Sequence, residues 1–154
     1  MQEFLIREAI VPELEATTKS GVIRELVVKL QEAGCFAANQ IDHVIAELHA
    51  REQLSSTGIG RGVAIPHTRF EEVSSLVGTI GISRAGIPFD SIDDEPVHFV
   101  FLLISQPDFP GPHLKALELI VRTTESDEFL AQLLAAHTRE EIWNVILSTP
   151  EPWE

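Results

Sequence analysis

Two segments in the first third of the chain repeat apolar residues at intervals of three and four, which places them on one face of a helix. In the first segment these residues are Val22, Ile23, Leu26, Val27 and Leu30, and in the second they are Ile41, Val44, Ile45 and Leu48. Ser20 is expected to cap the first helix, and Gly34 suits a left-handed stop at its end. Asn39 is expected to cap the second. The pattern therefore predicts two amphipathic helices.

The middle of the chain changes to a pattern that is typical of strands. Residues 76–82 and 97–104 are rich in β-branched and aromatic side chains, and the second run is apolar at almost every position. A strand that is covered on both faces has this composition, so both runs are expected to be central strands of one sheet. Residues 54–69 are rich in glycine and are expected to form a loop, a short strand at 63–65 and a turn.

The last third of the chain again predicts helices. Pro112 suits the first position of a helix, so a third helix is predicted to start at His113. A short helix is expected over 129–134, and Thr138 with Glu141 forms a capping box ahead of a final helix. The order of these elements predicts an α/β fold, a single layered domain over residues 1–154 with a mixed β-sheet flanked by helices on both faces.

Composition and charge restrict the classes of partner. The 154 residues carry a formal net charge of −13, which disfavours binding to nucleic acid or to anionic lipid. The longest apolar run, 99–104, is far shorter than the roughly 20 residues of a membrane-spanning helix, so no direct membrane insertion is expected. The first residues lack the basic start and apolar run of a secretory signal, and a cytoplasmic protein is therefore expected. The single cysteine, Cys35, is expected to be a buried or half-buried residue near a helix end.

The residues with special chemistry are densest between Gly58 and His67. Glycine at positions 58, 60 and 62 allows the backbone to approach a neighbour or a ligand closely. Neither a dinucleotide-binding fingerprint nor a P-loop fits, because Val63 stands where a third glycine belongs and no Lys-Ser/Thr pair follows. His67 comes directly after a proline and a short strand, which favours an exposed position. Spacing alone leaves open whether His67 is functional or a solvated turn residue.

Two further residues are candidates for binding an anion. His113, in the first turn of a predicted helix, would lie beside unpaired N–H groups that attract phosphate and favour a neutral imidazole. Arg51 offers a planar, permanently charged fork. The alternatives are ordinary helix capping for His113 and a solvated residue near a helix end for Arg51.

The remaining histidines and acidic residues are given no role. His98 lies within the apolar strand and is interpreted as a hydrogen-bonded core imidazole. No pair of histidines has the spacing of a zinc site, and the acidic run at 90–95 is interpreted as a solvated turn. No metal and no cofactor are therefore expected.

Three stretches together resemble a known family. Residues 51–69, REQLSSTGIGRGVAIPHTR, resemble the active-site signature of the fructose/mannitol-type enzyme IIA family of the bacterial phosphotransferase system, in which GIG-x-G is followed by alternating hydrophobic residues and Pro-His. Residues 86–104 resemble the family's acidic turn and central strand, and residues 111–120 resemble the segment with its second active-site histidine. The resemblance runs from the first helix to about Leu147.

The resemblance implies a function for the candidate residues. It places a phosphohistidine nucleophile on His67, with His113, Arg51 and helix N–H groups stabilising the phosphoryl group. The implied donor is the phosphocarrier protein HPr or its nitrogen-branch counterpart, which would dock on an apolar patch near the site, with Phe70, Phe109 or nearby leucines as candidates. The family's fold, a mixed sheet flanked by helices, agrees with the predicted one.

The resemblance has two departures and leaves the biological role open. Arg61 stands where asparagine is frequent and is expected to add phosphate affinity or alter the choice of donor, and Thr68 stands where glycine is frequent. The preferred interpretation is a phosphocarrier with a regulatory role, like the stand-alone nitrogen-regulatory members, which acts on a regulated target protein. One alternative is a sugar-specific IIA that passes phosphate to a separate IIB subunit, and another is a binding module that has lost phosphotransfer.

Overall fold

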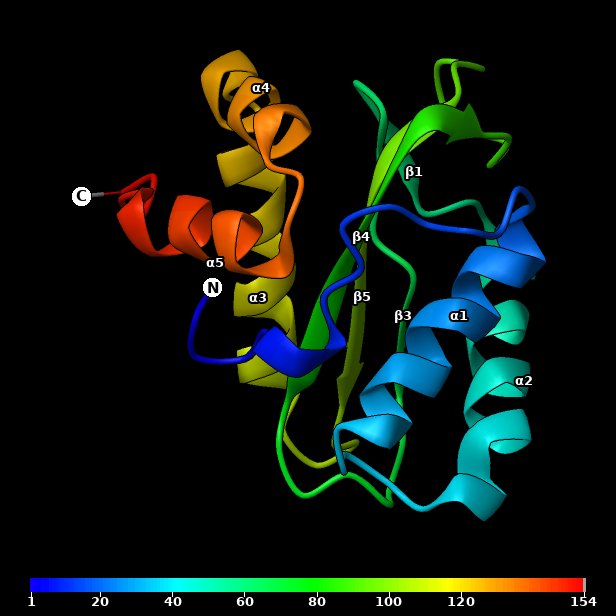
Figure 1. Ribbon diagram of the computed structural model, residues 1–154. Helices are drawn as coiled ribbons and strands as arrows, with labels where there is room; N and C mark the ends of the chain where they lie inside the picture. Colours follow the sequence, from blue (N-terminus) through cyan, green and yellow to red (C-terminus); the bar gives the residue numbers. More distant parts are fainter. Residues whose placement is uncertain (154) are drawn as a thin grey trace.

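The computed structural model describes residues 1–153, and its helices cover both faces of a mixed sheet (Figure 1). Two helices precede the sheet, α1 (Lys19–Glu32) and α2 (Ile41–Leu54), and short 3₁₀ turns stand at Arg7–Ala9 and Ala38–Gln40. Three helices follow the sheet, and they are α3 (Pro110–Thr124), α4 (Asp127–Ala135) and α5 (Arg139–Ser148). Among residues 1–153, no helix is long and apolar enough to cross a membrane.

The sheet is built around its last strand. The five strands are β1 (Gly58–Gly60), β2 (Val63–Ala64), β3 (His67–Arg69), β4 (Val77–Ile87) and β5 (Val97–Ser105). One edge of β5 pairs in parallel first with β2 and then with β3, and its other edge pairs with β4 in the antiparallel sense. The predicted α/β class and the mixed sheet are therefore confirmed.

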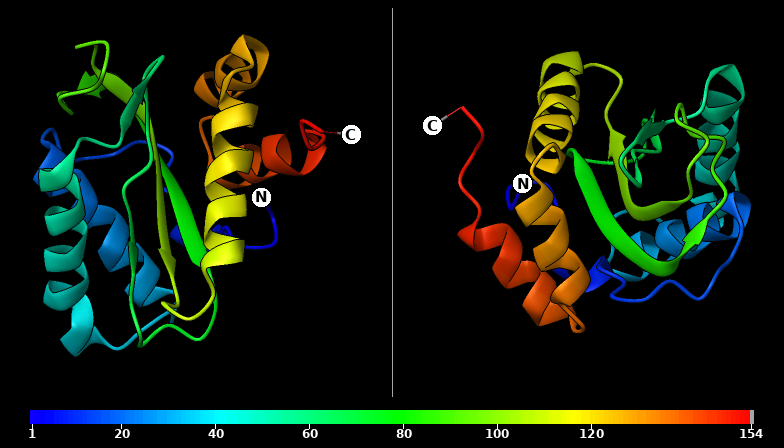
Figure 2. Two further views of the ribbon diagram at one scale, coloured as in Figure 1. Left: turned by 180° about the vertical axis from the view of Figure 1, so that it is seen from behind. Right: turned by 90° about the horizontal axis from the view of Figure 1, so that it is seen from above.

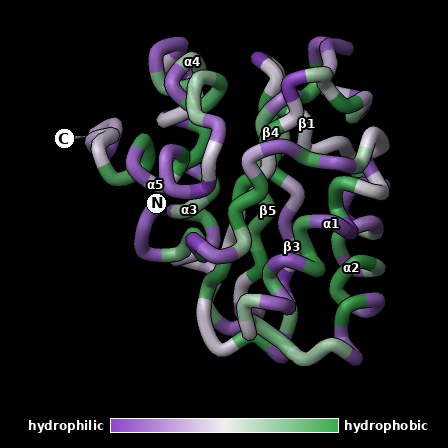
Figure 3. The backbone as a smooth tube through the Cα atoms, viewed as in Figure 1, coloured by the Kyte–Doolittle hydropathy of each residue, from purple (hydrophilic) through white to green (hydrophobic). Residues whose placement is uncertain are grey.

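Alternation along β5 divides the core into two halves. Val100, Leu102 and Ile104 belong to the cluster that packs with α1 and α2. Phe99, Phe101 and Leu103 belong to the cluster that packs with α3, α4 and α5. Because both faces of β5 are buried, its residues from Phe99 to Ile104 are all apolar. Seen from behind, β3 lies between α2 and α3 (Figure 2, left), and the hydropathy colouring marks β4 and β5 as largely apolar (Figure 3).

The prediction of one short strand and a turn at 54–69 was incomplete, because the segment contains three short strands. Pairing with β5 explains their formation, since Val63 lies opposite Phe99 and His67 lies opposite Leu103. His67 is consequently the first residue of a strand rather than a turn residue. It is held in register with the most buried strand of the molecule.

The predicted starts of three helices were wrong by a few residues. The cap of α1 is Thr18, whose hydroxyl accepts a hydrogen bond from Gly21 N at 3.1 Å, and Ser20 lies inside the first turn. Asn39 lies in a 3₁₀ turn just ahead of α2, which begins at Ile41. The third helix begins at Pro110, three residues before the predicted start at His113. Proline is tolerated at the start of a helix because the first N–H groups have no partner within the helix.

Other expected helix ends are confirmed. Gly34 follows α1 with a φ of +92°, the left-handed conformation that glycine adopts without strain. The hydroxyl of Thr138 caps α5 by accepting a hydrogen bond from Glu141 N at 3.0 Å. Cys35 is half-buried beside the end of α1, and burial raises the pKa of its thiol.

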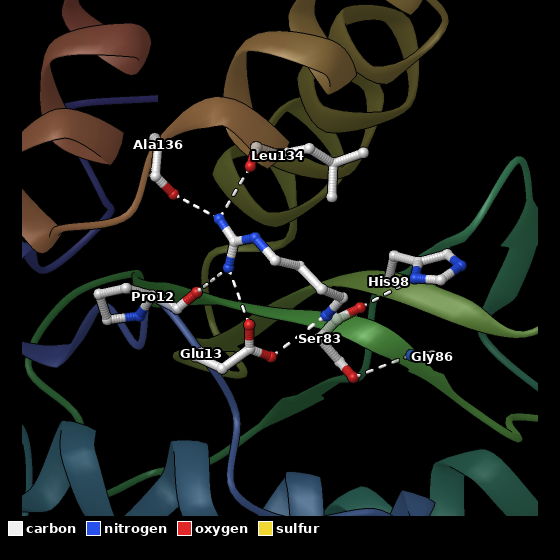
Figure 4. Close-up of polar contacts among 8 residues, drawn as sticks. Pro12, Glu13, Ser83, Gly86, His98, Leu134 and Ala136 are labelled. Carbon is white, nitrogen blue, oxygen red and sulfur yellow. Dashed lines mark hydrogen bonds and ion pairs between the residues drawn. The ribbon is translucent and has the colours of Figure 1, made fainter.

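Arg84, near the end of β4, joins three parts of the chain that are distant in sequence (Figure 4). Its guanidinium donates to Pro12 O at 3.1 Å and pairs with the Glu13 carboxylate at 2.9 Å. It also donates to Leu134 O at 2.9 Å and to Ala136 O at 2.6 Å, at the end of α4. The N-terminal segment, β4 and the C-terminal helices are thereby fixed to one another.

Candidate functional site

His67 occupies the start of β3 with one ring nitrogen already committed. Its Nδ1 lies 2.7 Å from Ile65 O. A carbonyl oxygen only accepts hydrogen bonds, so Nδ1 carries the proton and Nε2 keeps a free lone pair. Burial is the main cause that lowers the pKa of His67, and the charges of Arg51 and Arg69 lower it further, whereas the Ile65 bond and the Glu52 carboxylate oppose this change. The ring is consequently neutral at pH 7.

His113 lies next to His67 and is almost completely buried. Their ring centroids are 5.3 Å apart, with the ring planes inclined at 60°. The Nδ1 atom of His113 is 2.5 Å from the hydroxyl of Ser105, the last residue of β5. Burial lowers the pKa of His113 to about 4, with smaller contributions from His67 and Arg69. The predicted neutral imidazole is therefore present, with burial as its first cause.

The first turn of α3 offers fewer donors than the sequence suggested. His113 is its fourth residue, after Pro110, Gly111 and Pro112. Proline has no N–H group, so Gly111 is the one residue of these three with a backbone donor. The expected assistance from several helix N–H groups is thus reduced to that of Gly111.

Arg51 lies in the last turn of α2, on the other side of β3 from α3. One terminal nitrogen of its guanidinium donates to Ser55 O at 2.8 Å. Its charge lowers the pKa of His67, which places both residues in one electrostatic environment. The structure therefore brings His113 into contact with His67, and the charge of Arg51 acts on His67.

Arg69 is a further cation of this site that sequence reasoning missed. It stands two residues after His67 in β3, and residues two apart in a strand share a face. Its charge lowers the pKa of both His67 and His113. The guanidinium is exposed and has no hydrogen bond or ion pair within the 153 described residues. The strand period of two is the signal that identifies it.

Glu52 is a buried carboxylate behind the site, and it was also missed. It accepts a hydrogen bond from Thr57 N at 3.1 Å and another from the Thr57 hydroxyl, and it pairs with Lys19 Nζ at 2.8 Å. Thr57 O accepts from Ile65 N at 3.0 Å, and Ile65 O is the atom that holds His67. A continuous chain of contacts therefore runs from α1 and α2 to the imidazole of His67.

Arg61 does not point into the site. Its guanidinium pairs with the carboxylate of Asp127, the first residue of α4, and donates to O of Glu125, which caps the end of α3, at 2.9 Å. The expected contribution of Arg61 to phosphate affinity finds no support, because these contacts occupy the side chain elsewhere. Its φ of +60° explains why asparagine suits this position, since asparagine tolerates the left-handed conformation better than arginine does. Thr68 is half-buried, and its hydroxyl contacts Arg69 O at 3.5 Å.

The candidates for an apolar docking patch divide into two groups. Phe70 is buried between α2 and the sheet, so it was a wrong choice. Phe109 is 57% exposed and Leu114 is 60% exposed, and they flank the start of α3 on either side of His113 in sequence. We refer to Phe109 and Leu114 together as the α3 patch.

His98 and the acidic turn have structural explanations. His98 Nδ1 lies 2.8 Å from Ser83 O, as expected for a hydrogen-bonded imidazole within a strand. Asp90 and Asp94 both adopt positive φ in the turn before β5. Residues 1–153 contain no group of three or more histidine, cysteine or acidic side chains that is arranged to hold a metal ion.

The sequence matches a described family, one relative of similar length and part of a longer one. A sequence model of the family "Phosphoenolpyruvate-dependent sugar phosphotransferase system, EIIA 2" matches residues 3–149. The chain is 33% identical over 144 residues to a nitrogen regulatory protein of Bradyrhizobium diazoefficiens, covering 93% of this chain and 92% of that protein. It is also 33% identical over 144 residues to the fructose-specific EIIABC component of Bacillus subtilis, where 94% of this chain spans 22% of the relative.

Solved structures agree with this assignment. The crystal structure of the nitrogen regulatory protein IIA-Ntr from Neisseria meningitidis superposes with a TM-score of 0.83 at 28% identity, covering 94% of this chain and 97% of that one. IIA mannitol from Escherichia coli superposes with a TM-score of 0.75 at 18% identity, covering 90% and 96%, which shows a shared fold. This chain therefore belongs to the EIIA type-2 family of the phosphoenolpyruvate-dependent sugar phosphotransferase system.

Proposed function

We propose that this protein is a phosphohistidine carrier, in which Nε2 of His67 accepts a phosphoryl group from HPr or its nitrogen-branch counterpart. The observation that carries the proposal is the bond from His67 Nδ1 to Ile65 O, because it leaves Nε2 as the nucleophilic nitrogen. The Nε2 lone pair forms the new N–P bond while the P–N bond to the donor's histidine breaks, and the donor imidazole leaves with the electron pair. No proton has to be removed from Nε2 first, because Nδ1 carries the proton of the neutral ring.

Charge on the phosphoryl group is the main quantity that the site has to stabilise. The transition state of phosphoryl transfer is loose, so catalysis depends on alignment and on electrostatic stabilisation. Arg51 supplies a permanent cation near His67, and one of its terminal nitrogens is not bonded to Ser55 O. His113 supplies a neutral donor next to the reacting ring. As the N–P bond forms, the His67 ring becomes positive, and its bond to Ile65 O strengthens.

Donor and acceptor proteins have to reach the same nitrogen in turn. The α3 patch lies beside His113 and presents two exposed apolar side chains in a strongly acidic chain. An exposed apolar area next to a reactive group is typical of a protein-docking surface. We assign the α3 patch to the contact with the donor and with the acceptor.

A regulatory role is the preferred biological assignment. The nitrogen regulatory proteins of Bradyrhizobium diazoefficiens and Neisseria meningitidis match almost end to end, which favours a carrier whose phosphorylation state controls a target protein. The second candidate is sugar-specific transfer to a separate IIB subunit. Two findings favour it. The identity to the fructose-specific relative equals the identity to the nitrogen regulatory protein of Bradyrhizobium diazoefficiens. In addition, IIA mannitol of E. coli, which shares the fold of this chain, has been solved in complex with its phosphorylated IIB.

The experiment is intact-mass analysis after incubation with phosphoenolpyruvate, enzyme I and either HPr or its nitrogen-branch counterpart. Wild type should gain a single acid-labile phosphoryl group, and His67→Ala should gain none. His113→Ala should be labelled more slowly, and the exposed His137→Ala should behave like wild type as the matched control. Labelling of His67→Ala on another histidine would refute the assignment of the nucleophile. Absence of labelling in wild type with both donors would favour a binding module that has lost phosphotransfer.

A further inference from the structure

Ser105 ends the row of β5 side chains that faces α3. The residues before it in this row, Phe99, Phe101 and Leu103, are apolar and form part of the core beneath α3. Ser105 is 1% exposed, and it is the one polar residue of the row. Buried hydroxyl groups are in most cases hydrogen-bonded within the protein, because water does not reach them.

The hydroxyl of Ser105 has one partner among residues 1–153. That partner is Nδ1 of His113, at 2.5 Å. The backbone carbonyl of Ser105 already accepts a hydrogen bond from Phe70 N at 2.8 Å. The hydroxyl hydrogen therefore has a single acceptor within reach, which is the Nδ1 lone pair of a neutral His113.

We propose that Ser105 is a positioning residue that fixes the tautomer of His113, so that Nδ1 accepts a hydrogen bond and Nε2 keeps the proton. A neutral imidazole has one N–H group, and the bond made by one nitrogen determines which of the two carries the proton. At pH 7 His113 is neutral, because burial lowers its pKa to about 4. The hydroxyl that donates to Nδ1 consequently assigns the proton to Nε2.

The tautomer decides whether His113 attracts or repels a phosphoryl group on His67, and this step rests on the proposed function. With the proton on Nε2, this nitrogen of His113 donates a hydrogen bond to a phosphoryl oxygen. In the opposite tautomer the same nitrogen presents a lone pair to an oxygen that is itself negatively charged. Ser105 therefore supports transfer through His113, without contact to the phosphoryl group.

Long-range ¹H–¹⁵N NMR correlation of the histidine rings tests the tautomer without any donor protein. In wild type at pH 7, Nδ1 of His113 should have the frequency of an unprotonated nitrogen and Nε2 that of a protonated one. Ser105→Ala should give a mixture of tautomers, and Ser105→Thr, which keeps the hydroxyl, should retain the wild-type pattern. A protonated Nδ1 in wild type would overturn the proposal, whether or not the protein carries phosphate.

A kinetic cycle separates action through His113 from a general structural effect. Ser105→Ala should slow phosphoryl transfer about three- to tenfold, the factor that corresponds to one hydrogen bond of ordinary net strength. Ser91→Ala is the matched control, because the Ser91 hydroxyl is buried and has no partner among the described residues, and it should leave the rate unchanged. In a His113→Gln background, Ser105→Ala should have no further effect. Equal slowing in both backgrounds would show that Ser105 does not act through His113.

Discussion

The candidate site is positively charged, whereas the chain as a whole is strongly acidic. The protein carries a formal net charge of −13, but the charges of Arg51 and Arg69 act on His67, and that of Arg69 acts on His113 as well. Burial is the largest cause that lowers the pKa of both rings, the charge of Arg69 lowers both further, and the charge of Arg51 lowers that of His67. A neutral ring keeps the lone pair that a nucleophile needs, while the arginines supply the positive charge that a phosphoryl group requires. In the proposed function, charge and nucleophilicity are therefore provided by different side chains.

Arg69→Gln tests this division of labour. Removal of the Arg69 charge should raise the pKa of both His67 and His113, because that charge lowers the pKa of both rings. In wild type, protonation of His67 should occur below pH 6.5, so the nucleophile is lost only in more acidic solution, and in Arg69→Gln this loss should move to higher pH. NMR titration of the ring protons measures both pKa values directly. Arg24→Gln removes an exposed ion pair on α1 and is the control, which should leave both pKa values unchanged. Unchanged pKa values in Arg69→Gln would show that the charge of Arg69 does not act on the two histidines.

At the scale of elements, the series of contacts from Lys19 to His67 connects both N-terminal helices to the proposed nucleophile. Lys19 from α1 and Glu52 from α2 form an ion pair in which the carboxylate is 4% exposed. Lys19 Nζ also lies 4.7 Å from the centroid of the Phe89 ring. A buried carboxylate of this kind requires a partner, since desolvation of an unpaired charge is costly. The position of Thr57, and through it the Ile65 carbonyl, therefore depends on the packing of α1 against α2.

Lys19→Met should destabilise the protein by about 3 kcal/mol, because it leaves the Glu52 carboxylate buried without its cation. Lys19→Met combined with Glu52→Gln should recover part of this loss, since the double variant contains no unpaired charge. Urea unfolding at pH 7 measures both free energies. The exposed pair of Arg24 and Asp42 provides the control, and Arg24→Met should cost less than about 1 kcal/mol. Equal destabilisation by the single and the double variant would show that packing, rather than charge, accounts for the loss.

The sequence predicted the elements with a regular apolar period. It did not predict the elements and site residues that depend on contacts between distant segments. The apolar stripes of α1 and α2 and the continuous apolar run of β5 correspond to real helices and a real central strand. The strands β1, β2 and β3 have three, two and three residues, too few to give a period, and they exist because they pair with one another and with β5. The same reason applies to the site. His67, His113 and Arg51 were candidates from their local sequence and received their expected roles from a resemblance, whereas Ser105 and Glu52 are recognisable only from contacts between distant segments.

At the scale of the whole molecule, the sheet separates two layers of helices that share few direct contacts. The N-terminal segment runs along the outer edge of β4, where Leu5 and Val11 form isolated bridges to Gly78 and Gly81. Arg84 joins this segment to the end of α4, and Arg139 adds a bond from α5 to Ile10 O at 3.3 Å. The C-terminal helices are thus attached to the sheet both by their apolar faces and by arginines that bond backbone carbonyls.

Arg84→Met should therefore lower the free energy of unfolding by about 3 kcal/mol, because it removes several charge-assisted hydrogen bonds and leaves carbonyls at the end of α4 without this partner. The rate at which the folded protein accepts phosphate should stay at the wild-type value, because Arg84 is distant from His67 along the sheet. Arg84 follows Ile82, which pairs with Phe99 near the start of β5, whereas His67 pairs with Leu103 near its end. Urea unfolding and the phosphorylation assay measure the two quantities on the same sample. Arg122→Met, which breaks an exposed pair with Glu118, is the control and should change neither. A slower reaction in fully folded Arg84→Met would instead mean that the attachment of the C-terminal helices also sets the position of α3, and with it the distance between the two histidines.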